Sequence, residues 1–165
     1  MFTTVRQTVF DRPIDMYLEN RTGKDMKLFK TELQSGYLYN NPPELIKAGE
    51  TGHFKGDQTG LVGSSGFATY TVQVENLTTY ISIYWSHPEG NYDSIYYGYS
   101  SPFGVFFITP KDNLNPNQKP TNQVQNVKDW TNNEYSKQTI LTLNPVQLVQ
   151  SVTYVIQFGL GHTAV

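Results

Sequence analysis

Hydrophobic and polar residues alternate along most of this chain with a period of two residues. In the first such segment Ile14, Met16 and Leu18 are separated by Asp15 and Tyr17. This period is typical of β-strands that bury one face and leave the other in water. The alternation is clearest in the segments 14–19, 67–74, 80–85 and 151–158.

Residues that favour turns lie between these segments, as in the sequences 20–23, 40–43, 60–66, 75–78 and 87–90. Short strands separated in this way predict an all-β protein, either a sandwich or a barrel. A length of 165 residues corresponds to about one domain. We therefore expect residues 1–165 to form a single-domain antiparallel β-sandwich.

The stretch from 109 to about 138 departs from the alternation. Residues 109–126 contain three prolines and many Asn and Gln residues, and we expect a long loop there. A short helical turn is expected around Trp130. Strands are predicted to resume at 139–143 and 150–158, and residues 3–9 fit a further strand.

Composition excludes several classes of protein. Charged residues make up 16% of the chain and the net charge is −2, which provides no basic surface for nucleic acid. The absence of cysteine excludes disulfides, thiolate zinc sites and iron–sulfur clusters. The longest apolar run is far shorter than the ~20 residues that a membrane-spanning helix needs. The N-terminus has no signal-peptide pattern.

Catalytic and metal-binding motifs are also missing. The histidines His53, His87 and His162 are too far apart for a local ligand pair. The glycine-rich run 60–66 lacks the Lys-Ser/Thr ending of a phosphate-binding loop and the spacing of a nucleophile elbow. We expect no metal, no cofactor and no enzymatic activity. Carboxylates that converge only in the folded protein would still allow a hydrolase.

The most distinctive segment runs from Tyr80 to Phe107 and is rich in tyrosine. Strand alternation places Ile81, Ile83 and Trp85 toward the core and leaves Tyr80 outside. A single tyrosine is more often a core or cross-strand residue than a binding residue. A cluster of them suits the boundary between water and lipid, because each ring is apolar and carries a polar group.

The order of features then resembles a known family. Strand MYLEN (16–20), turn RTGK (21–24) and strand MKLF (26–29) are followed by SGYLYNNPPELIKAGETGHF (35–54), GLVGSSGFATYTV (60–72) and ISIYWSHPEGNYD (81–93). This succession resembles the aegerolysins and is similar to the actinoporin-like superfamily over about residues 14–100. The resemblance implies a β-sandwich that binds membrane lipid and takes part in pore formation, in some relatives as an insecticidal toxin acting beside a larger protein.

The resemblance also implies which residues contact lipid. They are aromatic or turn residues of the segments 81–99 and 37–39, namely Trp85, His87, Pro88, Tyr92, Tyr96, Tyr97, Tyr99, Tyr37 and Tyr39. Thirteen residues before the first clear strand leave no room for the N-terminal helix with which actinoporins perforate bilayers. A pore that depends on a partner protein is therefore favoured over an autonomous one.

Two classes of function follow. The first is a cytolysin or insecticidal toxin component, secreted or released, that binds a membrane lipid such as a sphingolipid or sterol mixture and forms homo-oligomers on the membrane. The alternative is a carbohydrate-binding lectin, because Tyr and Trp rings stack on sugars. Aromatic residues protruding from loops at one end of the fold would favour membrane binding. An aromatic platform on a sheet face would favour sugar binding.

Overall fold

The regular structure consists of β-strands throughout the described part of the chain. The computed structural model describes residues 13–59, 63–88, 92–113, 121–128, 135–143 and 151–159, with the backbone alone for 121–128 and 135–137. The strands are β1 (Ile14–Arg21), β2 (Met26–Ser35), β3 (Tyr37–Asn40), β4 (Leu45–Ile46), β5 (Thr51–Asp57), β6 (Ser64–Val74), β7 (Leu77–His87), β8 (Ser94–Ser101), β9 (Phe106–Asp112), β10 (Thr121–Lys128), β11 (Tyr135–Leu143) and β12 (Ser151–Phe158).

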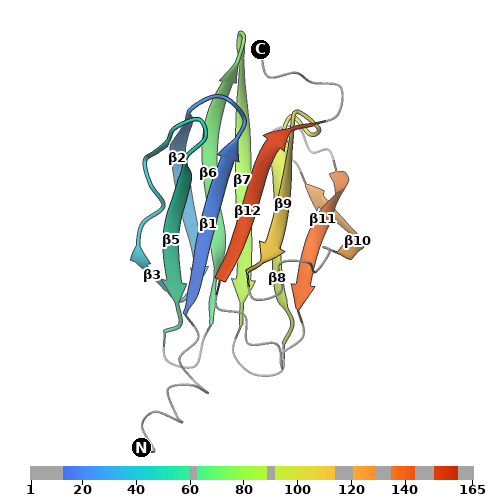
Figure 1. The fold of residues 1–165 in the computed structure, drawn as a ribbon. Helices are drawn as coiled ribbons and strands as arrows, with labels where there is room; N and C mark the ends of the chain where they lie inside the picture. The colour runs from blue at the N-terminus through green and yellow to red at the C-terminus, as the bar shows by residue number, and fades with distance from the viewer. Residues whose placement is uncertain are drawn as a thin grey trace, which may run out of the picture.

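These strands form two sheets that face each other as a sandwich (Figure 1). The five-stranded sheet has the order β3-β5-β1-β12-β9, and the seven-stranded sheet has the order β10-β11-β8-β7-β6-β2-β4. The prediction of an all-β sandwich is therefore confirmed. One pairing differs from an antiparallel arrangement, because β1 and β12 run parallel in the middle of the five-stranded sheet.

The core lies between the sheets and is formed by the inward residues of the predicted alternations. Ile14, Met16 and Leu18 are fully buried, as the period of two requires. The ring of Phe54 on β5 meets that of Trp85 on β7 edge-on, with 5.3 Å between centroids, and so joins the two sheets. The alternation thus determines which face of each strand is buried.

A glycine provides the space for this tryptophan. An added Cβ at Gly66 would lie 2.4 Å from the carbonyl oxygen of Glu32 and 3.0 Å from the Trp85 ring. Gly66 pairs with Trp85 across β6 and β7. The glycine-rich run before β6 therefore has a packing role at this position.

The buried side chain of Asn20 stabilises the turn between β1 and β2. Its amide donates hydrogen bonds to the carbonyl oxygens of Lys24 and Ile46, at 2.7 and 2.9 Å. Its Oδ1 accepts from the backbone N–H and the hydroxyl of Thr22. The predicted turn at 20–23 is confirmed, and Gly23 supplies its positive φ of 78°.

The expected long loop at 109–138 is wrong over much of its length. Strand β9 continues to Asp112, and β10 and the start of β11 lie within the same stretch. Pro110 is accommodated because β9 is the edge strand of its sheet and pairs only with β12. A proline cannot donate a ladder hydrogen bond, and an edge strand has one side on which none is needed.

Two other expectations lie outside the described residues, namely a strand at 3–9 and a helical turn around Trp130. The strand expected at 139–143 is confirmed as part of β11, and the one expected at 150–158 is confirmed from residue 151 onward as β12; residue 150 lies outside the described residues. Across the described ranges no helix has the length and apolar character needed to cross a membrane.

Candidate functional site

One end of the sandwich gathers the segments in which lipid contacts were expected. Ser35, Ser65, Ser86 and Ile95 are neighbours in register across β2, β6, β7 and β8. Since β2 and β7 end here and β6 and β8 begin here, the β2–β3 turn and the start of β8 lie at the same end, at the bottom of Figure 1. We call this the loop end and define it by Tyr37, Tyr39 and Tyr92.

The three tyrosines of the loop end are among the most exposed large apolar side chains of the described chain. Tyr92 is 71% exposed, Tyr39 is 59% and Tyr37 is 40%. The rings of Tyr37 and Tyr39 lie 5.2 Å apart, and the Lys55 ammonium lies 4.9 Å from the Tyr39 ring. Tyr37 begins β3 two residues after the end of β2, and Tyr92 lies two residues before β8. Three strand spacings, or roughly 14 Å, separate β2 from β8.

Three residues expected to contact lipid lie instead in the core. Trp85 and Tyr96 are fully buried, and His87 is 1% exposed. The Trp85 indole N–H donates to Ser64 Oγ at 2.9 Å, and His87 Nδ1 and the Tyr96 hydroxyl are 2.7 Å apart. These side chains point between the sheets, so they cannot reach a bilayer in this conformation. Their part in the lipid-contact prediction is corrected accordingly.

Tyr97 and Tyr99 belong to neither the core nor the loop end. Both lie on the outer face of the seven-stranded sheet, paired in register with Tyr84 and Ser82. Tyr97 is half-buried, whereas Tyr99 is only 5% exposed and its ring is 5.7 Å from that of Phe103. Pro88, just after β7, is also half-buried.

The surroundings of Tyr97 change its acidity. Burial raises the pKa of the Tyr97 phenol well above its ordinary value, and the nearby phenols of Tyr84 and Tyr99 raise it further. The hydroxyl of Tyr97 therefore stays protonated at any physiological pH.

An aromatic row crosses this outer face. Phe67, Tyr84 and Tyr97 are in register on β6, β7 and β8, with ring centroids 4.8 and 4.7 Å apart. Phe67 was not among the residues expected to contact lipid. The alternation in 67–74 indicates that Phe67 faces outward. It does not indicate which strand lies beside Phe67 or in which register that strand pairs.

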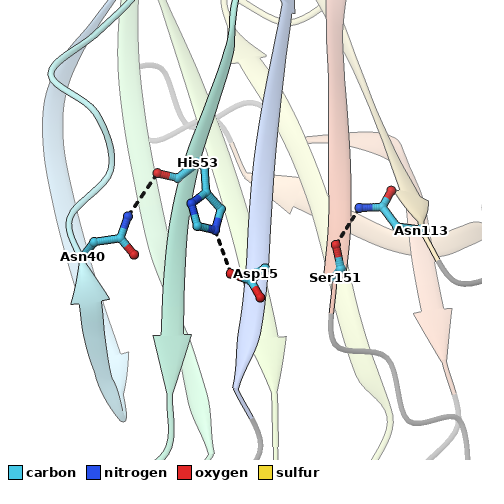
Figure 2. A network of polar contacts seen from close by, with 5 residues as sticks. All are labelled: Asp15, Asn40, His53, Asn113 and Ser151. Carbon is cyan, nitrogen blue, oxygen red and sulfur yellow. Dashed lines mark hydrogen bonds and ion pairs between the residues drawn. The ribbon is translucent and has the colours of Figure 1, made fainter.

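The outer face of the five-stranded sheet has a different character (Figure 2). His53 Nε2 lies 2.6 Å from Asp15 Oδ1, and the His53 ring stacks on Tyr17 with 4.8 Å between centroids. Asn113 donates to Ser151 Oγ at 2.6 Å and accepts from the Thr153 hydroxyl at 2.8 Å. The polar side chains named here thus bond one another across the outer face of this sheet.

Metal-binding geometry is not found among the residues that the structure describes. No group of three His, Asp or Glu side chains is arranged to hold an ion there. His162 lies outside these residues, whereas His53 and His87 have the aromatic and polar neighbours given above.

Comparison with known proteins gives a match in fold only. No protein-family model matches this sequence, and no curated protein matches it either. IP-1A from Alcaligenes faecalis aligns over 92% of this chain and 96% of its own at 8% identity, but a TM-score of 0.48 is too low to support an argument. The lipid-binding protein Nakanori aligns over 89% of this chain and 70% of its own, with 14% identity and a TM-score of 0.52. The chain thus has the β-sandwich fold that is found in a lipid-binding protein.

Proposed function

We propose that this protein binds membrane lipid through its loop end and serves as the docking component of a toxin. The observation that carries the proposal is the placement of Tyr37, Tyr39 and Tyr92 at one end of the sandwich with their rings exposed. The proposed role is non-enzymatic.

Tyrosine suits this role physically. Its ring is apolar enough to enter the headgroup region, and its hydroxyl still finds hydrogen bonds there. Each ring buried at the interface contributes about 1–2 kcal/mol from its apolar area. Three rings together therefore give a reversible attachment that one ring alone does not give.

Two independent likenesses support the proposal. The order of sequence motifs resembles the aegerolysins and the actinoporin-like proteins, which bind membrane lipid. The fold matches that of Nakanori, which is described as a lipid-binding protein. Neither likeness identifies the lipid, and we propose a sphingolipid and sterol mixture as the first target.

Sedimentation with liposomes tests the proposal. Vesicles of phosphatidylcholine alone are compared with vesicles of sphingomyelin and cholesterol, each mixed with the full chain. We expect the second mixture to pull the protein down, and the triple variant Tyr37→Ser, Tyr39→Ser, Tyr92→Ser to stay in solution. Leu77→Ser is the matched control, since Leu77 is 45% exposed and lies beside the β6–β7 turn, at the end of the sandwich opposite the loop end.

Two results would contradict the proposal. One is that no lipid mixture sediments the protein. The other is that the triple variant binds vesicles as well as the parent chain does, which would show that another surface makes the contact.

We further propose that binding leads to permeabilisation only together with a larger partner protein. Dye-loaded vesicles of the composition that sediments the protein separate binding from pore formation. Binding without dye release by the protein alone supports partner dependence. Dye release by the protein alone would replace it with an autonomous pore.

A further inference from the structure

The aromatic row on the seven-stranded sheet borders a small pocket. Phe67 lies at the junction, because its ring contacts Tyr84 on one side and lines the pocket on the other. The pocket has a volume of about 200 Å³, which is below the ~300–1,000 Å³ of sites for drug-sized ligands. Its size fits one ring-sized group. It is lined by Lys30, Glu32, Phe67, Thr69, Ser82 and Tyr99.

Polar groups of the pocket provide both donors and acceptors. Thr69 and Ser82 are buried at 3% and 2% exposure, and their hydroxyl oxygens lie 3.1 Å apart. The Lys30 ammonium lies 2.6 Å from a Glu32 carboxylate oxygen, and both side chains are about half exposed. A ligand over the pocket therefore meets hydroxyls beneath it and a charged pair beside it.

The arrangement of the rings restricts the kind of ligand. Phe67, Tyr84 and Tyr97 follow one another along a line on one surface, with interplanar angles of 46° and 31°. A site for a quaternary ammonium group encloses the cation with rings on several sides. The row instead lies along one side of a ligand, to which it offers the partly exposed edges and faces of rings that are tilted against one another.

A sugar ring matches these features. One face of a pyranose consists of C–H groups, which gain free energy when an aromatic ring covers them. Its edge carries hydroxyls, which both donate and accept hydrogen bonds and so match a mixed set of Lys, Glu, Thr and Ser groups. A fatty acyl chain would remove water from the half-exposed Lys30 and Glu32 charges without offering them a hydrogen bond in return, which is costly.

We propose that the pocket and the aromatic row form a saccharide-binding site that takes one pyranose residue of a glycan. The inference does not rest on the proposed lipid binding, because the two surfaces use different residues on different parts of the fold. The row lies two residues along the strands from the Ser65 and Ser86 register, or roughly 7 Å from the loop end. The pocket lies about two residues further along.

The glycan has two sources, a glycolipid headgroup or a soluble or protein-linked glycan. The position of the site close to the loop end is compatible with both. A competition experiment distinguishes the two sources. Soluble oligosaccharide should displace the protein from a glycan surface in either case. It should displace the protein from glycosphingolipid vesicles only if the same site binds the glycolipid headgroup.

A glycan array with the labelled full chain tests the site. We expect binding to a defined group of saccharides, weakened about tenfold or more by Phe67→Ala or Tyr84→Ala. The matched control is Tyr17→Ala, which removes a half-buried ring from the outer face of the other sheet and should leave glycan binding unchanged. Circular dichroism shows whether each variant is folded.

The double variant Lys30→Gln, Glu32→Gln keeps the test informative if a ring variant fails to fold. Both positions are exposed, so the fold should persist, and glycan binding should still fall several-fold. The triple tyrosine variant of the loop end should bind the array as the parent does, whatever its behaviour on vesicles.

Either of two results overturns the inference. The first is an array on which no saccharide binds above background. The second is saccharide binding that the pocket variants leave intact or that the Tyr17→Ala control removes equally.

Discussion

The outer faces of the two sheets differ although they belong to one sandwich. On the five-stranded sheet Asp15, His53 and Tyr17 contact one another, and Asn113 bonds Ser151 and Thr153. On the seven-stranded sheet half-buried rings form a row beside a pocket. The contacts described on the first face are mostly polar, whereas those on the second are mostly between aromatic rings.

The difference also concerns what lies beneath each face. The seven-stranded sheet carries Trp85 and Tyr96 on its inner side, on the same two strands that bear Tyr84 and Tyr97 on the outer side. Both sides of β7 and β8 therefore carry aromatic rings.

The largest effect is expected for Trp85→Ala. Removing a fully buried indole that contacts Phe54 leaves a cavity, and such changes lower the free energy of unfolding by about 3–5 kcal/mol. Urea unfolding followed by circular dichroism measures this loss. If the outer aromatic row depends on this core, glycan and vesicle binding should fall together in this variant. A stable variant with unchanged unfolding would show that Trp85 is not the link between the sheets.

Alkaline pH should destabilise the protein. Burial raises the pKa of Tyr70, Tyr97 and Tyr154 above the usual tyrosine value, while the unfolded chain ionises near pH 10. The folded form thus holds more protons above that pH, and stability falls as pH rises. Each phenol lowers the free energy of unfolding by at most about 1.4 kcal/mol per pH unit, and the half-buried Tyr97 lowers it by less.

The variant Tyr97→Phe tests the share of the outer face in this alkaline loss. Urea midpoints at neutral pH and above pH 10 should show a shallower decline for the variant than for the parent. An identical decline in both proteins would mean that the core phenols alone account for the effect.

A smaller effect is expected for Asp15→Ala on the polar face. The Asp15 and His53 side chains are 32% and 41% exposed, so water screens their interaction. We expect a loss of about 0.5–1 kcal/mol in the free energy of unfolding, measured by urea unfolding in low salt and again in high salt, where the loss should shrink. A loss of several kcal/mol would mean that this face is as closely packed as the aromatic one.

The smallest effect on stability is expected for Tyr92→Ser at the loop end. This side chain is 71% exposed, and exposed substitutions usually change the free energy of unfolding by less than about 0.5 kcal/mol. Vesicle binding should nevertheless weaken, because one of three rings is lost. A marked loss of stability would indicate that Tyr92 packs against the fold and is not reserved for a membrane.

Much of the fold could be predicted from the alternation alone. The inward positions of Ile81, Ile83 and Trp85 follow from the period of two, and the structure buries all three. The pattern could not show that Pro110 lies in an edge strand, since the sheet order depends on pairing with β12, far along the chain. Proline and amide-rich composition therefore suggested a loop where β9 and β10 lie.

The site was predictable only in part, for a related reason. Tyr96 and Tyr97 are adjacent in sequence, yet one is fully buried and the other faces outward. A tyrosine-rich segment does not reveal this phase without its partner strands. Nor does sequence show that Phe67 stands beside Tyr84, because that neighbour relation is a property of register.

The parallel pairing of β1 with β12 affects how the protein can be made and divided. The first and last described strands are neighbours in the middle of the five-stranded sheet, so this layer cannot close until β12 has been synthesised. Truncation before Ser151 would split the layer into two pieces instead of trimming its border. If two fragments were supplied separately, one ending near Leu143 and one carrying β12, they would have to reassemble by pairing β1 with β12.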